Sequence, residues 1–358
     1  MRVDNQPSII ENRIVPQAHL RVSSKKSSDN GVLVGTAPWE FEADADCVQR
    51  PAEFSWTEVA AIACDSHARL YVFNRGAHPM MVFAPDGSFL KSWGEGVFAR
   101  AHGLTIGPDD AVYCTDDLDH TVRKFTRDGQ LLLTLGTSGR PSDTGATSMD
   151  FRSIRRPGPP FHYPTNLALG ADGQIYVADG YGNARIHEFT PKGQWVRSWG
   201  EPGSGPGQFH IPHGLAVARD GTIYVADREN SRIQLFSASG EFLGALTDVA
   251  RPCQVAFDGA GNLLVAELGY RAGMWPGTQP PSPDAPGGRV SIFNPQGVLL
   301  ARWGGGLNPT ASGDFFAPHD ICVNSRGDLF VAEVVWSAGG NRGVVPPDCH
   351  SLQRFSRR

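Results

Sequence analysis

Short apolar runs alternate with turn-forming residues along most of the chain. Six runs share one form, in which a mostly apolar stretch ends in an acidic or amide residue, and they lie at 70–74, 112–116, 175–179, 223–227, 263–267 and 329–333. β-Branched and aromatic residues are frequent in these runs, and a turn such as Asp172-Gly173 or Asp220-Gly221 precedes most of them. The pattern predicts β-strands that are joined by tight turns.

Each of the first five runs begins a longer repeat. A further apolar run, a glycine turn and a last run follow it, as in EFTPKGQWVRSWG at 188–200. Four antiparallel strands in roughly 40–50 residues are typical of a propeller blade. The predicted fold class is therefore all-β, a six-bladed β-propeller. The sixth repeat contains only one further strand, at 351–355, so the segment 32–42 is expected to supply its outermost strand and cover its edge.

The repeats also predict how the chain is organised. An N-terminal extension (1–31) is expected to precede a single propeller (32–358). Two repeats are longer than the others, and their surplus residues fall in Pro- and Gly-rich stretches near 137–160 and 270–288. These stretches are interpreted as loop insertions, which often shape a binding site in repeat proteins.

Counting back 14 residues from the residue that ends each second strand gives six equivalent positions: Ala60, His102, Thr165, His213, Cys253 and His319. Histidine occurs there in the second, fourth and sixth blades only. Alternate blades stand a third of a turn apart, and inner strands line the axis, so the three imidazoles are expected to converge. A single histidine is more often structural, but three neutral imidazoles with an open coordination position are typical of catalytic zinc.

Asp320 directly follows the third histidine, at a position where the second and fourth blades have Gly103 and Gly214. A carboxylate beside the axis needs a partner, because an unpaired buried charge is costly. Three alternatives remain open. Asp320 could orient a histidine, bind a hard cation such as calcium, or cap a turn.

Residues 182–236 closely resemble the NHL-repeat propeller of peptidyl-α-hydroxyglycine α-amidating lyase (peptidylamidoglycolate lyase). The segments that carry the resemblance are DGYGNARI (179–186), PGQFHIPH (206–213), ADREN (226–230), FNRGAHP (73–79), AHGLTI (101–106) and APHDI (317–321). The resemblance covers roughly residues 57–335, and so nearly the whole predicted propeller. NHL repeats alone say little about function, whereas these segments together with the histidines are much more specific.

The resemblance implies two metal sites. The family's catalytic zinc corresponds to the three histidines found by counting. Its structural calcium corresponds to the carboxylate of Asp320 and the backbone carbonyls of Ile62 and Leu104. The chain departs from the family two residues before the third histidine, where Ala317 replaces a methionine.

The resemblance also implies a reaction. The family cleaves the N–C bond of an α-hydroxyglycine-type (amidoglycolate) substrate to an amide and glyoxylate, which makes this chain a carbon–nitrogen lyase. Tyr181 corresponds to the active-site tyrosine and is the candidate general base. Arg75 and Arg228 correspond to the family's two arginines. Both follow the second strand of a blade, and such a pair suits a substrate carboxylate.

Two other functions remain open: a metal-dependent propeller hydrolase that resembles lactonases, and a non-catalytic NHL interaction module. Lactonases usually gather acidic and amide ligands around calcium, so three histidines count against the first. A net charge of −5 disfavours nucleic acid as a partner. No run approaches the ~20 apolar residues that a membrane helix needs. The expected partner is a small-molecule or peptide substrate of the α-hydroxyglycine type.

The cysteines favour a cytoplasmic location. All six are scattered singly without a CxxC pair, so neither a thiolate zinc site nor a disulfide framework is predicted. The resemblance places the family's half-cystines at His162 with Gly182 and at Tyr224 with Leu235, and both pairs are absent here, as in a reducing compartment. The N-terminus also lacks the apolar core of a signal peptide.

Overall fold

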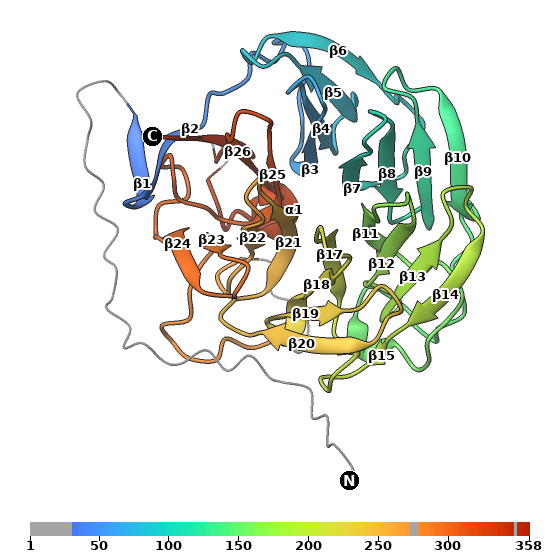
Figure 1. Ribbon diagram of the computed structural model, residues 1–358. Coiled ribbons are helices and arrows are strands. Elements are labelled where there is room, and N and C mark those ends of the chain that lie inside the picture. The colour runs from blue at the N-terminus through green and yellow to red at the C-terminus, as the bar shows by residue number, and fades with distance from the viewer. Residues whose placement is uncertain (1–30, 273–277, 347–348) are drawn as a thin grey trace.

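The computed structural model describes residues 31–272, 278–346 and 349–358. Within these ranges the chain is almost entirely β-structure, and six sheets stand like blades around a common axis (Figure 1). The prediction of an all-β, six-bladed propeller is confirmed. The extension expected at 1–31, apart from its last residue, lies outside the described residues, as do residues 273–277 of the insertion expected at 270–288.

The first five blades each consist of four consecutive antiparallel strands with the first strand innermost (Figure 1). Blade one contains β3 (Val59–Cys64), β4 (Leu70–Asn74), β5 (Met80–Phe83) and β6 (Phe89–Trp93). Blade two contains β7 (Ala101–Ile106), β8 (Val112–Asp116), β9 (Thr121–Phe125) and β10 (Leu131–Gly136). Blade three contains β11 (Pro164–Leu169), β12 (Ile175–Asp179), β13 (Arg185–Phe189) and β14 (Trp195–Trp199). Blades four and five contain β17 (Pro212–Val217), β18 (Ile223–Asp227), β19 (Arg232–Phe236), β20 (Phe242–Leu246); and β21 (Pro252–Phe257), β22 (Leu263–Glu267), β23 (Arg289–Phe293), β24 (Leu299–Gly304). A short parallel pair, β15 (Glu201–Pro202) and β16 (Gln208–Phe209), lies in the connection from blade three to blade four.

The sixth blade joins the two ends of the chain. Its strand order is β25 (Pro318–Val323), β26 (Leu329–Glu333), β27 (Leu352–Arg357), β2 (Trp39–Asp44) and β1 (Val32–Thr36). The segment expected to form one strand at 32–42 therefore forms two strands of a hairpin, and β2 pairs with β27 (Figure 1). The reason is local: Gly35 and Pro38 lie in the middle of the segment, and both favour a turn.

Each of the six predicted runs forms the second strand of a blade, with the bounds that the pattern predicts. Both faces of these strands are buried, because a neighbouring blade packs on each side; Val72, Val177 and Val225 are 0% exposed. Burial on both faces explains why these runs are continuously apolar rather than alternating.

Three connections are much longer than the turns. Residues 137–163 contain the 3₁₀ turn η1 (Phe151–Ser153), and residues 268–288 join β22 to β23. Residues 334–351 join β26 to β27 and contain α1 (Val335–Ala338) and η3 (Gly340–Arg342), an insertion that the repeat pattern did not predict. No helix in the described ranges is long and apolar enough to cross a membrane.

Candidate metal centre and active site

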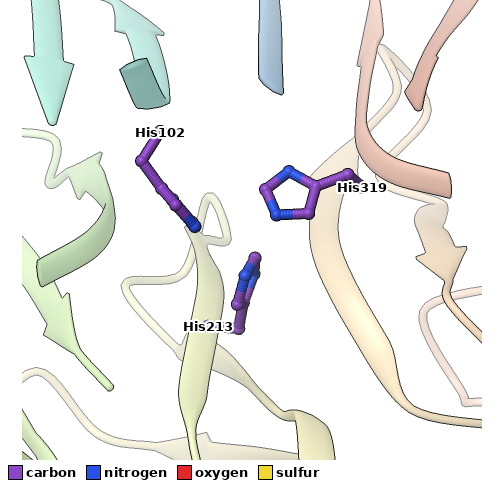
Figure 2. Close-up of side chains that lie close together, drawn as sticks. All are labelled: His102, His213 and His319. Atoms are coloured by element: carbon purple, nitrogen blue, oxygen red, sulfur yellow. The ribbon is translucent and has the colours of Figure 1, made fainter. Parts of the chain in front are cut away.

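The innermost strand of every blade contains a β-bulge near its start. The register between the first and second strands is interrupted there, and the interruption includes Ala60, His102, Thr165, His213, Cys253 and His319. A bulge leaves a residue out of the ladder and re-aims its side chain. The count of 14 residues therefore marks a feature of the backbone, and the structure brings the three histidines together at the axis (Figure 2).

The three imidazoles share one hydrogen-bonding arrangement. The Nδ1 atoms of His102, His213 and His319 lie 2.6, 2.8 and 2.7 Å from backbone carbonyl oxygens. Those carbonyls belong to the equivalent positions of the next blades: Thr165, Cys253 and Ala60. Because a carbonyl can only accept, each Nδ1 carries the proton and each Nε2 keeps its lone pair.

The histidine cluster matches the requirements of a zinc site. One ring nitrogen from each imidazole lies within 4.8 Å of the others, and all three side chains are buried. Burial lowers the pKa of His319 to about 3 and holds the pKa values of His102 and His213 well below the usual range, so the rings are neutral. Three neutral Nε2 donors, oriented by bonds from their Nδ1 atoms, fit a three-histidine zinc.

Tyr181 lies next to this cluster, in the loop that follows β12. Its hydroxyl oxygen is 3.0 Å from Nε2 of both His102 and His213. Arg228, in the 3₁₀ turn η2 (Arg228–Asn230), donates to the same oxygen at 3.3 Å. Burial raises the pKa of the Tyr181 phenol, and the charge of Arg228 opposes this effect. The hydroxyl therefore lies where a group bound beside the histidines would meet it.

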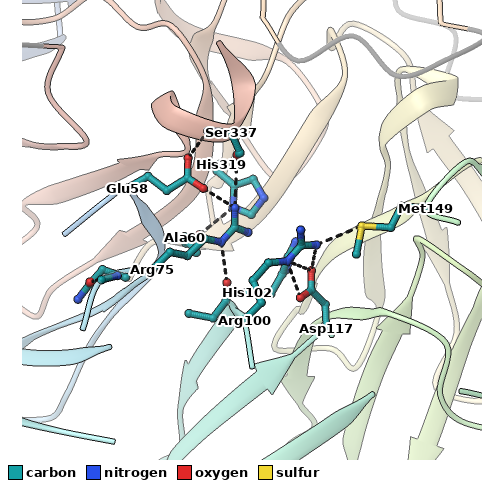
Figure 3. Close-up of polar contacts among 12 residues, drawn as sticks. Glu58, Ala60, Arg75, Arg100, His102, Asp117, Met149, His319 and Ser337 are labelled. Atoms are coloured by element: carbon teal, nitrogen blue, oxygen red, sulfur yellow. Dashed lines mark hydrogen bonds and ion pairs between the residues drawn. The ribbon is translucent and has the colours of Figure 1, made fainter. Parts of the chain in front are cut away.

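Arg75 approaches the cluster from the end of β4. It donates to the carbonyl of Ala101 at 3.0 Å, to the carboxylate of Glu58 at 2.5 Å and to the hydroxyl of Ser337 at 3.3 Å (Figure 3). The carbonyl of Ala101 immediately precedes His102 in the chain. Arg75 is thus fixed next to the inner strand that contains His102.

A cavity of about 510 Å³ connects these groups. Four residues singled out from the sequence line it: Arg75, Tyr181, Arg228 and His319. Three further arginines also line it, and the sequence analysis missed them: Arg100, Arg271 and Arg342. Arg100 gives no signal in the repeat pattern, and the other two lie in insertions, where the repeat register has no equivalent position. The cavity therefore carries more positive charge than the sequence predicted.

The acidic residues that end the second strands have a structural role that counting did not reveal. In five blades this carboxylate accepts a hydrogen bond from the backbone N–H of the residue 17 positions earlier in the chain. The bonds join Ala99 to Asp116, His162 to Asp179, His210 to Asp227, Ala250 to Glu267 and Phe316 to Glu333. In blades two, four and six, these bonds fix the loop that leads to the histidine of the inner strand.

Asp320 is 2% exposed and directly follows His319 in β25. Its carboxylate accepts hydrogen bonds from the backbone N–H groups of Ile62 at 3.1 Å and Ile321 at 2.8 Å, and burial raises its pKa to about 8. The histidine-orienting role considered for Asp320 is taken by the backbone carbonyls instead. The carboxylate lies beside the backbone of Ile62, and Leu104 lies in β7 two residues after His102. Carboxylate and carbonyl oxygens are a donor set that suits calcium.

The half-cystine positions implied by the resemblance test its residue-by-residue alignment. Gly182 donates a backbone hydrogen bond to His162 at 2.9 Å, and Tyr224 is paired with Leu235 in the ladder between β18 and β19. Both pairs of positions are therefore adjacent, as disulfide partners must be. Cysteines 47, 64, 114, 253 and 322 are free thiols.

Comparison with known proteins supports the resemblance to the amidating-lyase family. Residues 161–189 and 209–236 match the NHL repeat. The chain is 36% identical over 118 residues to peptidyl-α-hydroxyglycine α-amidating lyase 1 of Drosophila melanogaster, an alignment that covers 32% of this chain and 19% of that protein. It is 30% identical over 244 residues to human NHL repeat-containing protein 3, which covers 64% of this chain and 67% of that protein.

Among solved structures, a gluconolactonase from Xanthomonas campestris has the same fold, with a TM-score of 0.58, 14% identity and coverage of 89% of this chain and 90% of that chain. The chain also matches peptidyl-glycine α-amidating monooxygenases, but it spans only 23% to 33% of their length. Alignments with two of these proteins reach 78% of this chain. The chain therefore belongs to the family of NHL-repeat propellers that includes peptidyl-α-hydroxyglycine α-amidating lyase.

Proposed function

We propose that this chain is a zinc-dependent lyase that cleaves the N–C bond of an α-hydroxyglycine-type (amidoglycolate) substrate to an amide and glyoxylate. One observation carries the proposal. Three imidazoles with protonated Nδ1 atoms direct their Nε2 atoms to one point beside a cavity that also holds a phenol and arginines. The names of the amidating relatives support the same activity.

The reaction needs a general base, cationic groups that bind the substrate carboxylate, and a group that binds the carbinol hydroxyl. Zinc held by the three Nε2 atoms would lower the pKa of the carbinol hydroxyl. Tyr181 accepts the hydroxyl proton as the carbonyl of glyoxylate forms. The C–N bond breaks, its electron pair passes to nitrogen, and the proton that Tyr181 accepted passes to nitrogen to give the amide. Arg75 and Arg228 hold the substrate carboxylate, and the charge of Arg228 also favours the phenolate of Tyr181.

The competing functions lack such support. A lactonase-like site would gather carboxylates, whereas the axial cluster in the described part of the chain consists of neutral imidazoles. A non-catalytic NHL module would have no use for a phenol and three imidazoles that are buried against one another. A panel of lactones and α-hydroxyhippurate, assayed side by side, separates lactone hydrolysis from glyoxylate release.

Zinc content tests the metal site directly. We expect about one zinc per chain in the purified protein, and a sharp loss in His102→Ala, His213→Ala and His319→Ala, because two imidazoles hold zinc far more weakly than three. Elemental analysis after dialysis measures this, and glyoxylate release should fall in parallel. His67→Ala tests the other group in the described part of the chain that could hold a metal, Asp65 with His67 and Asp110, and it should leave the zinc content unchanged. Full zinc content in all three axial variants would refute the site.

We also propose a structural calcium at Asp320, with the carbonyls of Ile62 and Leu104 as further ligands. Without a cation the Asp320 carboxyl has a folded pKa of about 8 against an ordinary 3.8. A carboxyl group whose pKa is higher in the folded than in the unfolded protein stabilises the fold fully below its unfolded pKa, here pH ~4. This stabilisation is lost as the pH rises through the folded pKa of about 8.

In the presence of a chelator, the melting temperature should therefore decrease as the pH is raised from 5 to 8. Added calcium should restore it at pH 8, because the cation binds the ionised carboxylate. Burial raises the pKa of Glu333 to about 8 as well. Asp320→Asn isolates the site, because it keeps Glu333 and removes only the Asp320 charge. An undiminished calcium response in Asp320→Asn, measured by differential scanning calorimetry, would contradict the calcium site.

Finally, we propose that the chain works in the cytoplasm on a small-molecule or peptide substrate of this class. The free thiols and the missing half-cystine pairs support a reducing compartment. The size of the cavity, about 510 Å³, supports a substrate whose reacting end is enclosed.

A further inference from the structure

Five arginines line the cavity, and three of them form an ion pair with a carboxylate. Arg75 pairs with Glu58 at 2.5 Å. Arg228 pairs at 2.8 Å with Glu229, a carboxylate that Arg251 shares at 2.9 Å. Arg100 forms a bidentate pair, its Nε lying 2.8 Å and 3.0 Å from the two oxygens of Asp117. Each of these three arginines therefore already has an acidic partner.

The other two arginines, Arg271 and Arg342, are held differently. Arg271 donates from Nη1 to the carbonyl oxygens of Gly305, at 2.7 Å, and Gly306. Arg342 donates from Nη2 to the carbonyl of Ala338 at 2.6 Å. Among the described residues, neither has a carboxylate within ion-pair distance. Backbone carbonyls orient a guanidinium without cancelling its charge, so two full positive charges remain on the lining of this cavity.

These two arginines lie at the outer part of the cavity. Both are exposed, whereas Tyr181 and Arg228 are 5% and 2% exposed. Each comes from an insertion, Arg271 from residues 268–288 and Arg342 from residues 334–351. A substrate whose hydroxyl and carboxylate face the buried end extends its amide portion toward this rim. Exposed arginines are ordinarily solvated. Arg271 and Arg342 differ from such arginines because both line one cavity and hydrogen bonds to backbone carbonyls fix their guanidinium groups.

We propose that Arg271 and Arg342 form an anion-binding subsite, and that the preferred substrate carries a second carboxylate on its amide side. The proposal rests on the proposed lyase function for the direction in which the substrate lies. The two arginines then act as specificity-determining residues, because a charge-assisted bond is available only to an amide portion that is itself anionic.

Binding of two unreactive probes tests the subsite. N-(4-carboxybenzoyl)glycine and N-(4-carbamoylbenzoyl)glycine have nearly the same shape and differ in one distal charge. Calorimetry with the purified protein should give a Kd about tenfold lower for the carboxylated probe, as two partly exposed ion pairs would provide. The ratio of the two Kd values should shrink with added salt, because exposed charges are screened.

Substitutions assign that preference to the two residues. In the double variant Arg271→Gln and Arg342→Gln the ratio should approach one, and the corresponding lysine variants should keep most of it. Arg326→Gln is the matched control, because Arg326 is an exposed arginine in the turn between β25 and β26, outside the cavity lining. Equal Kd values for both probes in the wild type, or an unchanged ratio in the double glutamine variant, would overturn the subsite.

The α-hydroxylated forms of the two probes separate this proposal from the proposed function. Glyoxylate release with a higher kcat/KM for the carboxylated form supports both proposals. A binding preference without glyoxylate from either form would refute the lyase and leave the subsite standing. Glyoxylate from both forms at equal kcat/KM, with equal Kd values for the probes, would refute the subsite alone.

Discussion

Replacing Tyr181 by phenylalanine is expected to lower the turnover of α-hydroxyhippurate by about 10²–10⁴-fold, the usual contribution of a positioned acid or base. The substitution keeps the ring, which packs against His102 and His213 with centroids 5.2 and 5.6 Å away. It removes only the oxygen that lies 3.0 Å from both Nε2 atoms. The substrate affinity should change little, because the ring and the arginines remain. Steady-state kinetics with a glyoxylate readout measures both quantities.

Arg75→Ala is the matched comparison for this variant. Its guanidinium is fixed by Glu58 and the carbonyl of Ala101 rather than by the phenol. A carboxylate clamp acts on ground and transition states alike, so KM should rise while kcat stays closer to the wild-type value. Wild-type turnover in Tyr181→Phe, with zinc content unchanged, would exclude Tyr181 as the base.

Substitution of Arg228 tests carboxylate binding less specifically than substitution of Arg75. Arg228 is 2% exposed and donates to the Tyr181 hydroxyl at 3.3 Å, so its charge also lowers the pKa of the phenol. Removing it would change carboxylate binding and proton transfer together. The structure thus distinguishes two arginines that the sequence presents as equivalent.

The positions of the histidines could be predicted because the backbone repeats. Every inner strand carries its bulge at the same distance from the acidic or amide residue that ends the second strand, so a count along the chain suffices to align His102, His213 and His319. The partners of the imidazoles could not be predicted in the same way. They are carbonyls of the neighbouring blade, and the partner of His319 lies 259 residues away in the sequence.

The repeat pattern does not predict the two rim arginines or the turn within the closing hairpin. Arg271 and Arg342 belong to insertions, which have no equivalent in other blades, and only the folded chain brings them to one cavity. In the hairpin, the apolar character of 32–42 predicted strand structure correctly. The segment turns at Ala37 and Pro38, so it forms two strands rather than the single strand that its apolar pattern predicts.

The closing hairpin carries the largest expected effect on stability. In β2, Phe41 is 1% exposed and packs against Trp303 with a centroid distance of 5.2 Å. Two ion pairs add to the contact with β27, between Arg354 and Asp44 and between Arg358 and Glu42, each at 2.7 Å. The backbone ladder from Phe41 to Asp44 covers the edge of β27. Without the hairpin, the sixth blade ends in an unpaired strand above exposed aromatic side chains.

Deletion of residues 1–45 should therefore lower the melting temperature by about 10 °C or more and cause aggregation through the exposed edge. Deletion of residues 1–30 is the matched control, because it keeps both strands of the hairpin. Phe41→Ala should fall between the two, since removal of a buried phenylalanine costs about 3–5 kcal/mol. Scanning calorimetry and light scattering measure the two effects. If the 1–45 deletion stays monomeric and melts like the full chain, the hairpin does not hold the sixth blade closed, and the ring must be closed by the contacts of β25 and β26 with their neighbouring blades.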